Sequence, residues 1–126
     1  MRCNWKHSVF DEIRERANGV SELSDASIGE LTNINFAHIL AKGDNKYPKF
    51  CYYPKNIVVL TADEHHLLDH SSAQKRQDYT EIYLCDWNWI YELAEQLKTE
   101  YDQLVRGAVT LPQLIREYKR TEFPPR

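Results

Sequence analysis

Apolar residues recur at helical spacing in three segments of the chain, which predicts three amphipathic helices. The first covers residues 5–18 and ends in an Asn-Gly pair, a typical helix stop. The second covers residues 86–106, with Asp86 as its predicted cap. The third covers residues 111–120, with Thr110 as its cap and a proline in its first turn. The apolar positions of the first two helices are Val9, Phe10, Ile13 and Ala17, then Trp87, Ile90, Leu93, Ala94, Leu97, Tyr101 and Leu104.

The centre of the chain has a different pattern, with two short runs typical of β-strands. Thr32–Leu40 alternates between two faces, and Asn56–Leu60 is rich in β-branched residues. Lys42–Lys55 lies between them and contains glycine, asparagine and two prolines, so we predict a loop. Its length is unusual for a simple hairpin and indicates a functional loop. Thr61 then begins a helix through a capping box with Glu64.

These elements together predict an α+β fold in one domain that spans residues 1–126. Its core, residues 32–71, is a short two-stranded antiparallel hairpin followed by a helix, and further helices flank it. A chain of 126 residues is long enough for one modest core. No apolar run approaches the roughly 20 residues that span a bilayer, and the first ten residues lack a signal-peptide core. We therefore expect an intracellular protein without a membrane contact.

The charge and the cysteine content bear on whether the protein binds nucleic acid, forms disulfides or holds a structural zinc ion. The net charge is −3, which is not typical of a nucleic-acid-binding protein. The loop is nevertheless locally basic, because it contains four lysines, Lys42, Lys46, Lys49 and Lys55, and a single acidic residue, Asp44. Such a loop can contact phosphates, with an affinity that depends strongly on salt. The three cysteines are widely spaced and form no C-x-x-C pair, so we expect buried thiols rather than a disulfide framework or a zinc knuckle.

The candidate chemistry lies in the central segment. His38 ends the first strand at the polar loop, and histidine is the natural general base near neutral pH. A histidine that is merely hydrogen-bonded on a half-buried strand is the alternative interpretation. Asn56 is either an ordinary turn residue or a side chain that holds the loop in place.

A histidine cluster follows on the predicted helix. Two pairs of residues four apart can each grip a metal ion, namely His65 with Asp69 and His66 with His70. Adjacent residues point about 100° apart on a helix, so spacing alone does not choose between the pairs. A solvated, histidine-rich helix end is the alternative interpretation.

The motif AHILAKG…YP…NIVVLTADEHHLLDH resembles the HNH endonucleases of phages and bacteria, whose core is a ββα-metal unit. The resemblance covers residues 35–70 and is more specific for family than for substrate. It implies that His38 is the general base and that Asn56 orients the loop. It also implies that His65, nine residues after Asn56, binds one divalent ion of magnesium, manganese, nickel or zinc. Asp69 is then the preferred second ligand, with His66 and His70 in reserve.

The resemblance further implies hydrolysis of DNA phosphodiester bonds, by nicking or by double-strand cleavage. DNA is then the partner, the lysines of the loop contact its phosphates, and a homodimer would cut both strands. The expected location is the cytoplasm of a bacterial or phage-infected cell. Two departures from the family pattern matter. Ala37 stands where many relatives have a metal ligand, and the paired C-x-x-C motifs of many relatives are absent from this sequence.

These departures leave a second interpretation open, a catalytically degenerate protein of the same fold that serves as a DNA-binding or protein-binding module. An aromatic-rich stretch of the long helix, Trp87–Tyr91, would then contact a partner. A module that holds zinc only for structure at the histidine cluster is the third interpretation.

Overall fold

The computed structural model describes residues 4–40, 46–70 and 73–126. Within these residues the chain forms five α-helices and one two-stranded antiparallel sheet, so the predicted α+β class is confirmed. In chain order the elements are α1 (Ser8–Ala17), β1 (Phe36–His38), β2 (Ile57–Val59), α2 (Ala62–His70), α3 (Ala73–Tyr83), α4 (Asn88–Val105) and α5 (Leu111–Lys119).

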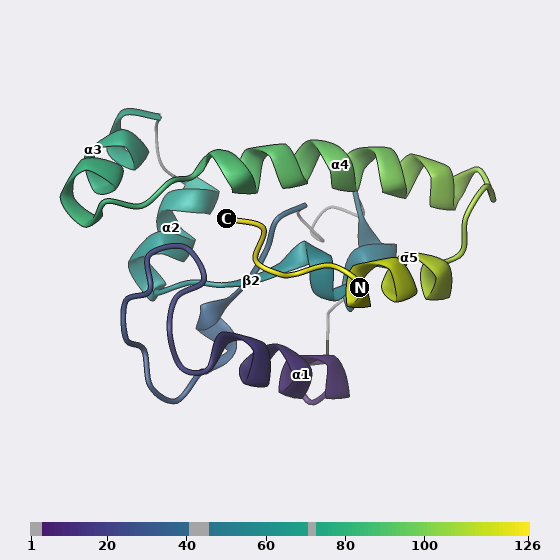
Figure 1. Ribbon diagram of the computed structural model, residues 1–126, viewed down its shortest axis with the longest axis horizontal. Coiled ribbons are helices and arrows are strands. Elements are labelled where there is room, and N and C mark those ends of the chain that lie inside the picture. Colours follow the sequence, from purple (N-terminus) through teal and green to yellow (C-terminus); the bar gives the residue numbers. More distant parts are fainter. Residues whose placement is uncertain (1–3, 41–45, 71–72) are drawn as a thin grey trace.

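The hairpin lies between two helices, with α4 along one side of the molecule and α1 on the other (Figure 1). In the sheet Phe36 pairs with Val59, and His38 pairs with Ile57. Alternate side chains point to opposite faces of a strand, so each face meets a different helix. The face towards α1 buries Phe36, Ile57 and Val59 with Val9, Phe10, Ile13 and Ala17. The other face buries Ala37, Val58 and Leu60 with Trp89, Ile90, Leu93 and Leu97 of α4.

Short-range signals in the sequence set the helix ends. Thr61 Oγ1 accepts from the Glu64 backbone N–H at 3.1 Å, and a Glu64 carboxylate oxygen accepts from the Thr61 N–H at 2.9 Å, which is the expected capping box. Asn18 ends α1 in the left-handed region with φ 53°. The beginning of α1 differs from the prediction. The helix starts at Ser8 because the His7 imidazole Nδ1 accepts from the Val9 N–H at 3.1 Å and caps it there.

Both strands are shorter than predicted, because polar side chains fold the flanking residues into 3₁₀ turns. The turn Asn33–Asn35 precedes β1, and the Asn35 side chain accepts from the Thr32 N–H at 3.0 Å. The turn Pro54–Asn56 precedes β2. Its proline lacks the N–H that a strand would need, which favours a turn at this point.

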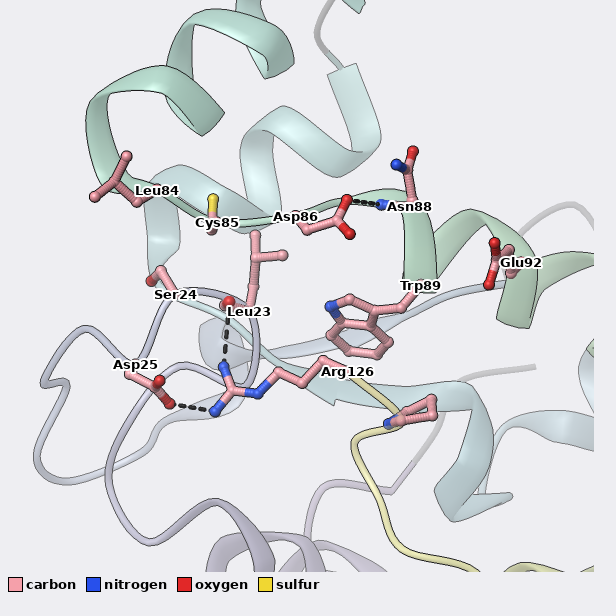
Figure 2. Close-up of a pocket in the computed structure, with 11 residues that line it drawn as sticks. Leu23, Ser24, Asp25, Leu84, Cys85, Asp86, Asn88, Trp89, Glu92 and Arg126 are labelled. Carbon is pink, nitrogen blue, oxygen red and sulfur yellow. Dashed lines mark hydrogen bonds and ion pairs between the residues drawn. The ribbon is translucent and has the colours of Figure 1, made fainter.

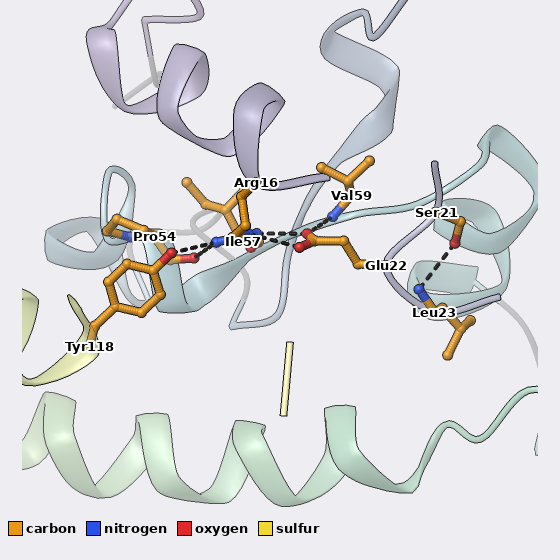
Figure 3. Close-up of polar contacts among 8 residues, drawn as sticks. All are labelled: Arg16, Ser21, Glu22, Leu23, Pro54, Ile57, Val59 and Tyr118. Atoms are coloured by element: carbon orange, nitrogen blue, oxygen red, sulfur yellow. Dashed lines mark hydrogen bonds and ion pairs between the residues drawn. The ribbon is translucent and has the colours of Figure 1, made fainter. Parts of the chain in front are cut away.

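Arg16 and Glu22 form a buried ion pair (Figure 3). Arg16 Nε and Nη2 donate to the two Glu22 oxygens at 2.8 and 2.7 Å. Arg16 also donates to the Pro54 carbonyl, the Tyr118 hydroxyl and the Ile57 carbonyl at 3.0, 3.0 and 2.6 Å. Burial alone would lower the pKa of the guanidinium, but Glu22 and Tyr118 outweigh burial, so the pKa of Arg16 is raised and the group stays charged.

Glu22, the partner of Arg16, also binds the backbone of Val59. The Glu22 backbone N–H donates to the Val59 carbonyl at 2.8 Å, and Glu22 Oε1 accepts from the Val59 N–H at 2.8 Å. One residue thereby satisfies both polar backbone groups of Val59 on the edge of β2, as a neighbouring strand would. The segment after α1 is held against the sheet in this way.

The C-terminal segment closes the same region. Phe123 lies under the Arg16 guanidinium at 4.2 Å and makes an edge contact with Trp89 of α4. The chain after α5 therefore returns beneath α4 towards α2 (Figure 1). Arg16 thus links α1, the residues before β2, α5 and the C-terminal segment.

The cysteines differ from the expectation of three buried thiols. Cys85 is a buried free cysteine, but Cys51 is disulfide-bonded, so the expectation is wrong for Cys51. None of the helices in the described ranges combines the length and the apolar character that a membrane span requires.

Glu22→Gln should lower the free energy of unfolding by about 3–5 kcal/mol, because it leaves the buried guanidinium without its counter-charge. Asp11→Asn is the matched control. Asp11 pairs with Arg14 at 2.9 Å, but its side chain is 76% exposed, so we expect a loss below about 1 kcal/mol. Urea denaturation of both variants measures the difference. Equal losses would contradict the central role of the buried pair.

Candidate functional site

His38 lies at the end of β1, and its ring is fixed by the loop that follows. Its Nε2 is 2.9 Å from the Cys51 carbonyl oxygen. A carbonyl only accepts hydrogen bonds, so Nε2 carries the proton and the lone pair of the neutral ring resides on Nδ1. Trp5 contacts the same ring edge-on, with the ring centres 6.3 Å apart. The imidazole thus has a defined tautomer and a defined orientation.

Asn56 connects the two ends of the loop between the strands. The side chain is fully buried, and its oxygen accepts from the Leu40 N–H at 2.7 Å. Its amide nitrogen donates to the Leu40 carbonyl at 3.2 Å and to the Phe50 carbonyl at 3.3 Å. Phe50 directly precedes Cys51, whose carbonyl holds His38. The Asn56 side chain therefore fixes both the residues after His38 and the residue before its acceptor.

His65 lies in the first turn of α2, and each of its ring nitrogens has a separate partner. Nδ1 donates to the Ile34 carbonyl at 2.7 Å, and Nε2 is 3.0 Å from an Asp69 carboxylate oxygen. The hydrogen bond that His65 donates to the Asp69 carboxylate is the main cause of the raised pKa of His65. Burial opposes this shift, and the hydrogen bond to the Ile34 carbonyl adds to it. His65 is bound before β1, and His38 lies at its end. Ile34, which accepts the hydrogen bond from His65, is four residues before His38. Four residues of extended chain span about 13 Å, so the backbones of Ile34 and His38 are at most about 13 Å apart.

Glu64 holds the start of α2 in place. The carboxylate is fully buried, and it accepts from the hydroxyls of Ser21 and Ser24 and from the Tyr79 hydroxyl at 2.9 Å. Its fourth bond is the capping contact with Thr61. Four donors satisfy the buried charge, so α2 begins at a fixed place relative to the hairpin. His65 is the next residue.

The donor set at His65 fits a divalent ion in part. Metal-bound histidines commonly donate their second N–H to a carbonyl, which is the arrangement of His65 with Ile34. Nε2 and the Asp69 carboxylate then converge on one point. Ala37 is fully buried in the core and has no donor atom. Among the described residues there is no group of three or more histidine, cysteine, aspartate or glutamate side chains with metal-binding geometry.

The remaining predicted site residues fall into separate groups. His66 is exposed on α2. Lys46 and Lys49 are exposed beside the turn that carries Cys51, where they can meet a phosphate. Lys55 has another partner, because its ammonium pairs with Glu100 of α4 and its side chain is only 19% exposed. Lys42 and the side chain of His70 lie outside the described part of the structure.

Two groups that orient the candidate site were not found from the sequence. They are the backbone carbonyls of Ile34 and Cys51, which hold His65 and His38. A carbonyl is present at every residue, so no sequence pattern marks the ones that matter. The capping box pointed to Glu64, but its four-fold contact depends on Ser21 and Tyr79, which are distant in sequence.

Comparisons with protein-family models, curated proteins and solved structures found no match to this chain.

The His65–Asp69 pair should stabilise the fold more in acid than in base. The pKa of His65 is raised above its usual 6.5. Its contribution is therefore complete below the unfolded value and is lost as the pH rises through the folded value. Asp69→Asn should lower the melting temperature more at about pH 5.5 than at about pH 8.5.

Asp63→Asn, an exposed carboxylate in the first turn of the same helix, is the control for that measurement. Its effect on the melting temperature should be similar at both pH values. A loss for Asp69→Asn that is the same at both pH values would contradict the ion pair.

Proposed function

We propose that the protein is a metal-dependent endonuclease of the HNH type, which hydrolyses DNA phosphodiester bonds with His38 as general base. The observation that carries the proposal is the position of Asn56. Its side chain joins Leu40 and Phe50, so the residues that orient His38 are held as one unit. This arrangement supports the proposal because a general base needs a fixed orientation.

In the proposed reaction His38 Nδ1 removes a proton from a water molecule. The hydrogen bond from Nε2 to the Cys51 carbonyl keeps the ring in the tautomer that makes Nδ1 basic, and it also stabilises the imidazolium after proton transfer. The resulting hydroxide attacks the phosphorus, and the bond to the opposite oxygen breaks. Because the imidazole of His38 is already oriented, it needs no change of conformation before the proton transfer, which lowers the barrier of the proposed reaction.

His65 and Asp69 would hold the divalent ion in this proposal. Two protein ligands suit an ion that keeps several waters and takes further oxygens from a phosphate, as magnesium and manganese do. When bound, the ion would stabilise negative charge on the phosphate and on the leaving oxygen. The Ile34 carbonyl keeps His65 Nε2 directed towards that position.

Lys46 and Lys49 would contact the DNA backbone, which gives affinity but no sequence preference. We leave Lys55 out of this contact because Glu100 holds its ammonium. One such site cuts one strand, so double-strand cleavage would need a homodimer or two successive events.

A catalytically inactive binding module is the second candidate function. Ala37 favours it, because a buried methyl group at this position supplies no third ligand. In that case the ββα unit would still bind DNA or a protein, and metal affinity and hydrolysis would both be absent.

His38→Ala should reduce nicking of supercoiled plasmid by about 10²–10⁴-fold, the usual contribution of a general base. The assay uses the intact protein with Mg²⁺, Mn²⁺ or Ni²⁺ and follows conversion to open circles. His7→Gln is the matched control, because His7 caps α1 and stacks on Tyr52 without belonging to the proposed site. Its nicking rate should equal that of the unaltered protein. Intact plasmid with every ion would support the inactive module, and undiminished nicking by His38→Ala would remove His38 from the mechanism.

His65→Ala should weaken Mn²⁺ binding by at least about tenfold, since even the loss of an outer-sphere partner has that effect. Isothermal titration calorimetry on the intact protein measures the affinity. His66→Ala removes the neighbouring imidazole and should leave it unchanged. A loss with His66→Ala and none with His65→Ala would assign the ion to the other helix face.

A further inference from the structure

An open cavity of about 640 Å³ lies outside the ββα unit (Figure 2). The first turn of α4 forms one wall, the segment 23–25 forms a second, and the C-terminal residues Pro125 and Arg126 form a third. The proposed catalytic and metal-binding residues are not among its lining residues. Its volume falls within the usual range for small-molecule sites.

Trp89 supplies an unused hydrogen-bond donor to this cavity. The side chain is 6% exposed, and it makes an edge contact with Phe123. Figure 2 shows its indole nitrogen directed towards the middle of the lining residues. No described residue accepts a hydrogen bond from this N–H, and the nitrogen itself is not among the fully buried polar atoms. It is therefore open to water in the cavity, and an acceptor atom on a ligand can take the place of that water.

The charges around the cavity select the ligand. Asp25 pairs with Arg126, which neutralises both groups. Asp86 and Glu92 also line the cavity, and neither forms an ion pair with any residue in the described part of the structure. Asp86 Oδ1 accepts from the Asn88 N–H at 2.8 Å, and its second oxygen lies on the cavity side in Figure 2. Two carboxylates repel an anion and attract a cation, so phosphate and DNA do not fit this cavity.

We propose that the cavity binds the N-terminal end of a short peptide. The peptide ammonium contacts Asp86 and Glu92, and its first carbonyl oxygen accepts from the Trp89 indole N–H. This chemistry needs a cation next to an acceptor, which is what an α-ammonium and its neighbouring carbonyl provide. A single small amine would leave most of the cavity empty, whereas a peptide of two or three residues would fill it.

Cys85 also lines the cavity, but it does not suggest covalent chemistry. Burial, together with the nearby Glu64 carboxylate, raises the pKa of its thiol. The thiol is therefore protonated near neutral pH and a poor nucleophile. The site binds without a reaction.

NMR of the intact, ¹⁵N-labelled protein tests the proposal. Trp89→Phe identifies the Trp89 indole signal, and the unaltered protein is then titrated with glycylglycinamide. We expect a saturable shift of that signal. N-acetylglycylglycinamide, which lacks the ammonium, and inorganic phosphate should leave it in place. A shift by either of these, or no shift with glycylglycinamide at millimolar concentration, overturns the proposal.

Charge variants provide the second measurement. The predicted cap Asp86 precedes the actual N-cap of α4, Trp87, and accepts from the Asn88 N–H. Asp86→Asn keeps a side-chain oxygen for that hydrogen bond while the charge is lost. It should weaken glycylglycinamide binding about tenfold, the value of one charge-assisted hydrogen bond, and Glu92→Gln should act likewise. Glu95→Gln is the matched control, since Glu95 pairs with Lys98 on the same helix and does not line the cavity. Unchanged affinity in both cavity variants would also overturn the proposal.

Discussion

The structure depends on the burial of one complete ion pair, Arg16 with Glu22. Removing two charges from water is costly, and the cost is offset only when every donor and acceptor finds a partner. A guanidinium has five N–H donors. Arg16 makes five hydrogen bonds, to Glu22 twice, to the Pro54 and Ile57 carbonyls and to the Tyr118 hydroxyl. Because these partners come from separate parts of the chain, the charge can be buried only when α1, the hairpin and α5 have all assembled.

The same constraint reaches the candidate site. Pro54 and Ile57 lie on either side of Asn56, so Arg16 holds the backbone that carries this asparagine. Asn56 in turn holds the residues that orient His38. A series of contacts therefore connects the buried charge of Arg16 with the imidazole of His38, and each contact is a hydrogen bond to a backbone group. We infer that contacts with the core fix the positions of the side chains in the candidate site. The exposed residues of the loop contribute little to these positions.

The sequence predicted well those features that depend on residues a few positions apart, such as the ends of helices. The Thr61–Glu64 capping box is present, Thr110 caps α5, and Asn18 ends α1 where the pattern indicated. The central order of strand, loop, strand and helix was also correct. What the sequence did not predict depends on distant partners. The strands are short because a 3₁₀ turn precedes each of them. The burial of Arg16 has no local signal in the sequence. Its role depends on Tyr118, 102 positions away. The orienting carbonyls of the site have the same origin, since only the fold selects them.

The segment 20–25 is shared by the two proposed sites. Glu22 pairs with β2. Ser24 donates to Glu64 next to His65, and Asp25 binds Arg126 at the wall of the cavity. Such proximity invites the idea that a ligand in the cavity controls α2. Coupling, however, needs an element with two arrangements of similar free energy, one of which the ligand favours. A buried Glu64 with four donors has no second arrangement of comparable free energy, because any shift would leave a charge unsatisfied. The shared segment therefore fixes the position of both sites, and the physical argument favours their independence.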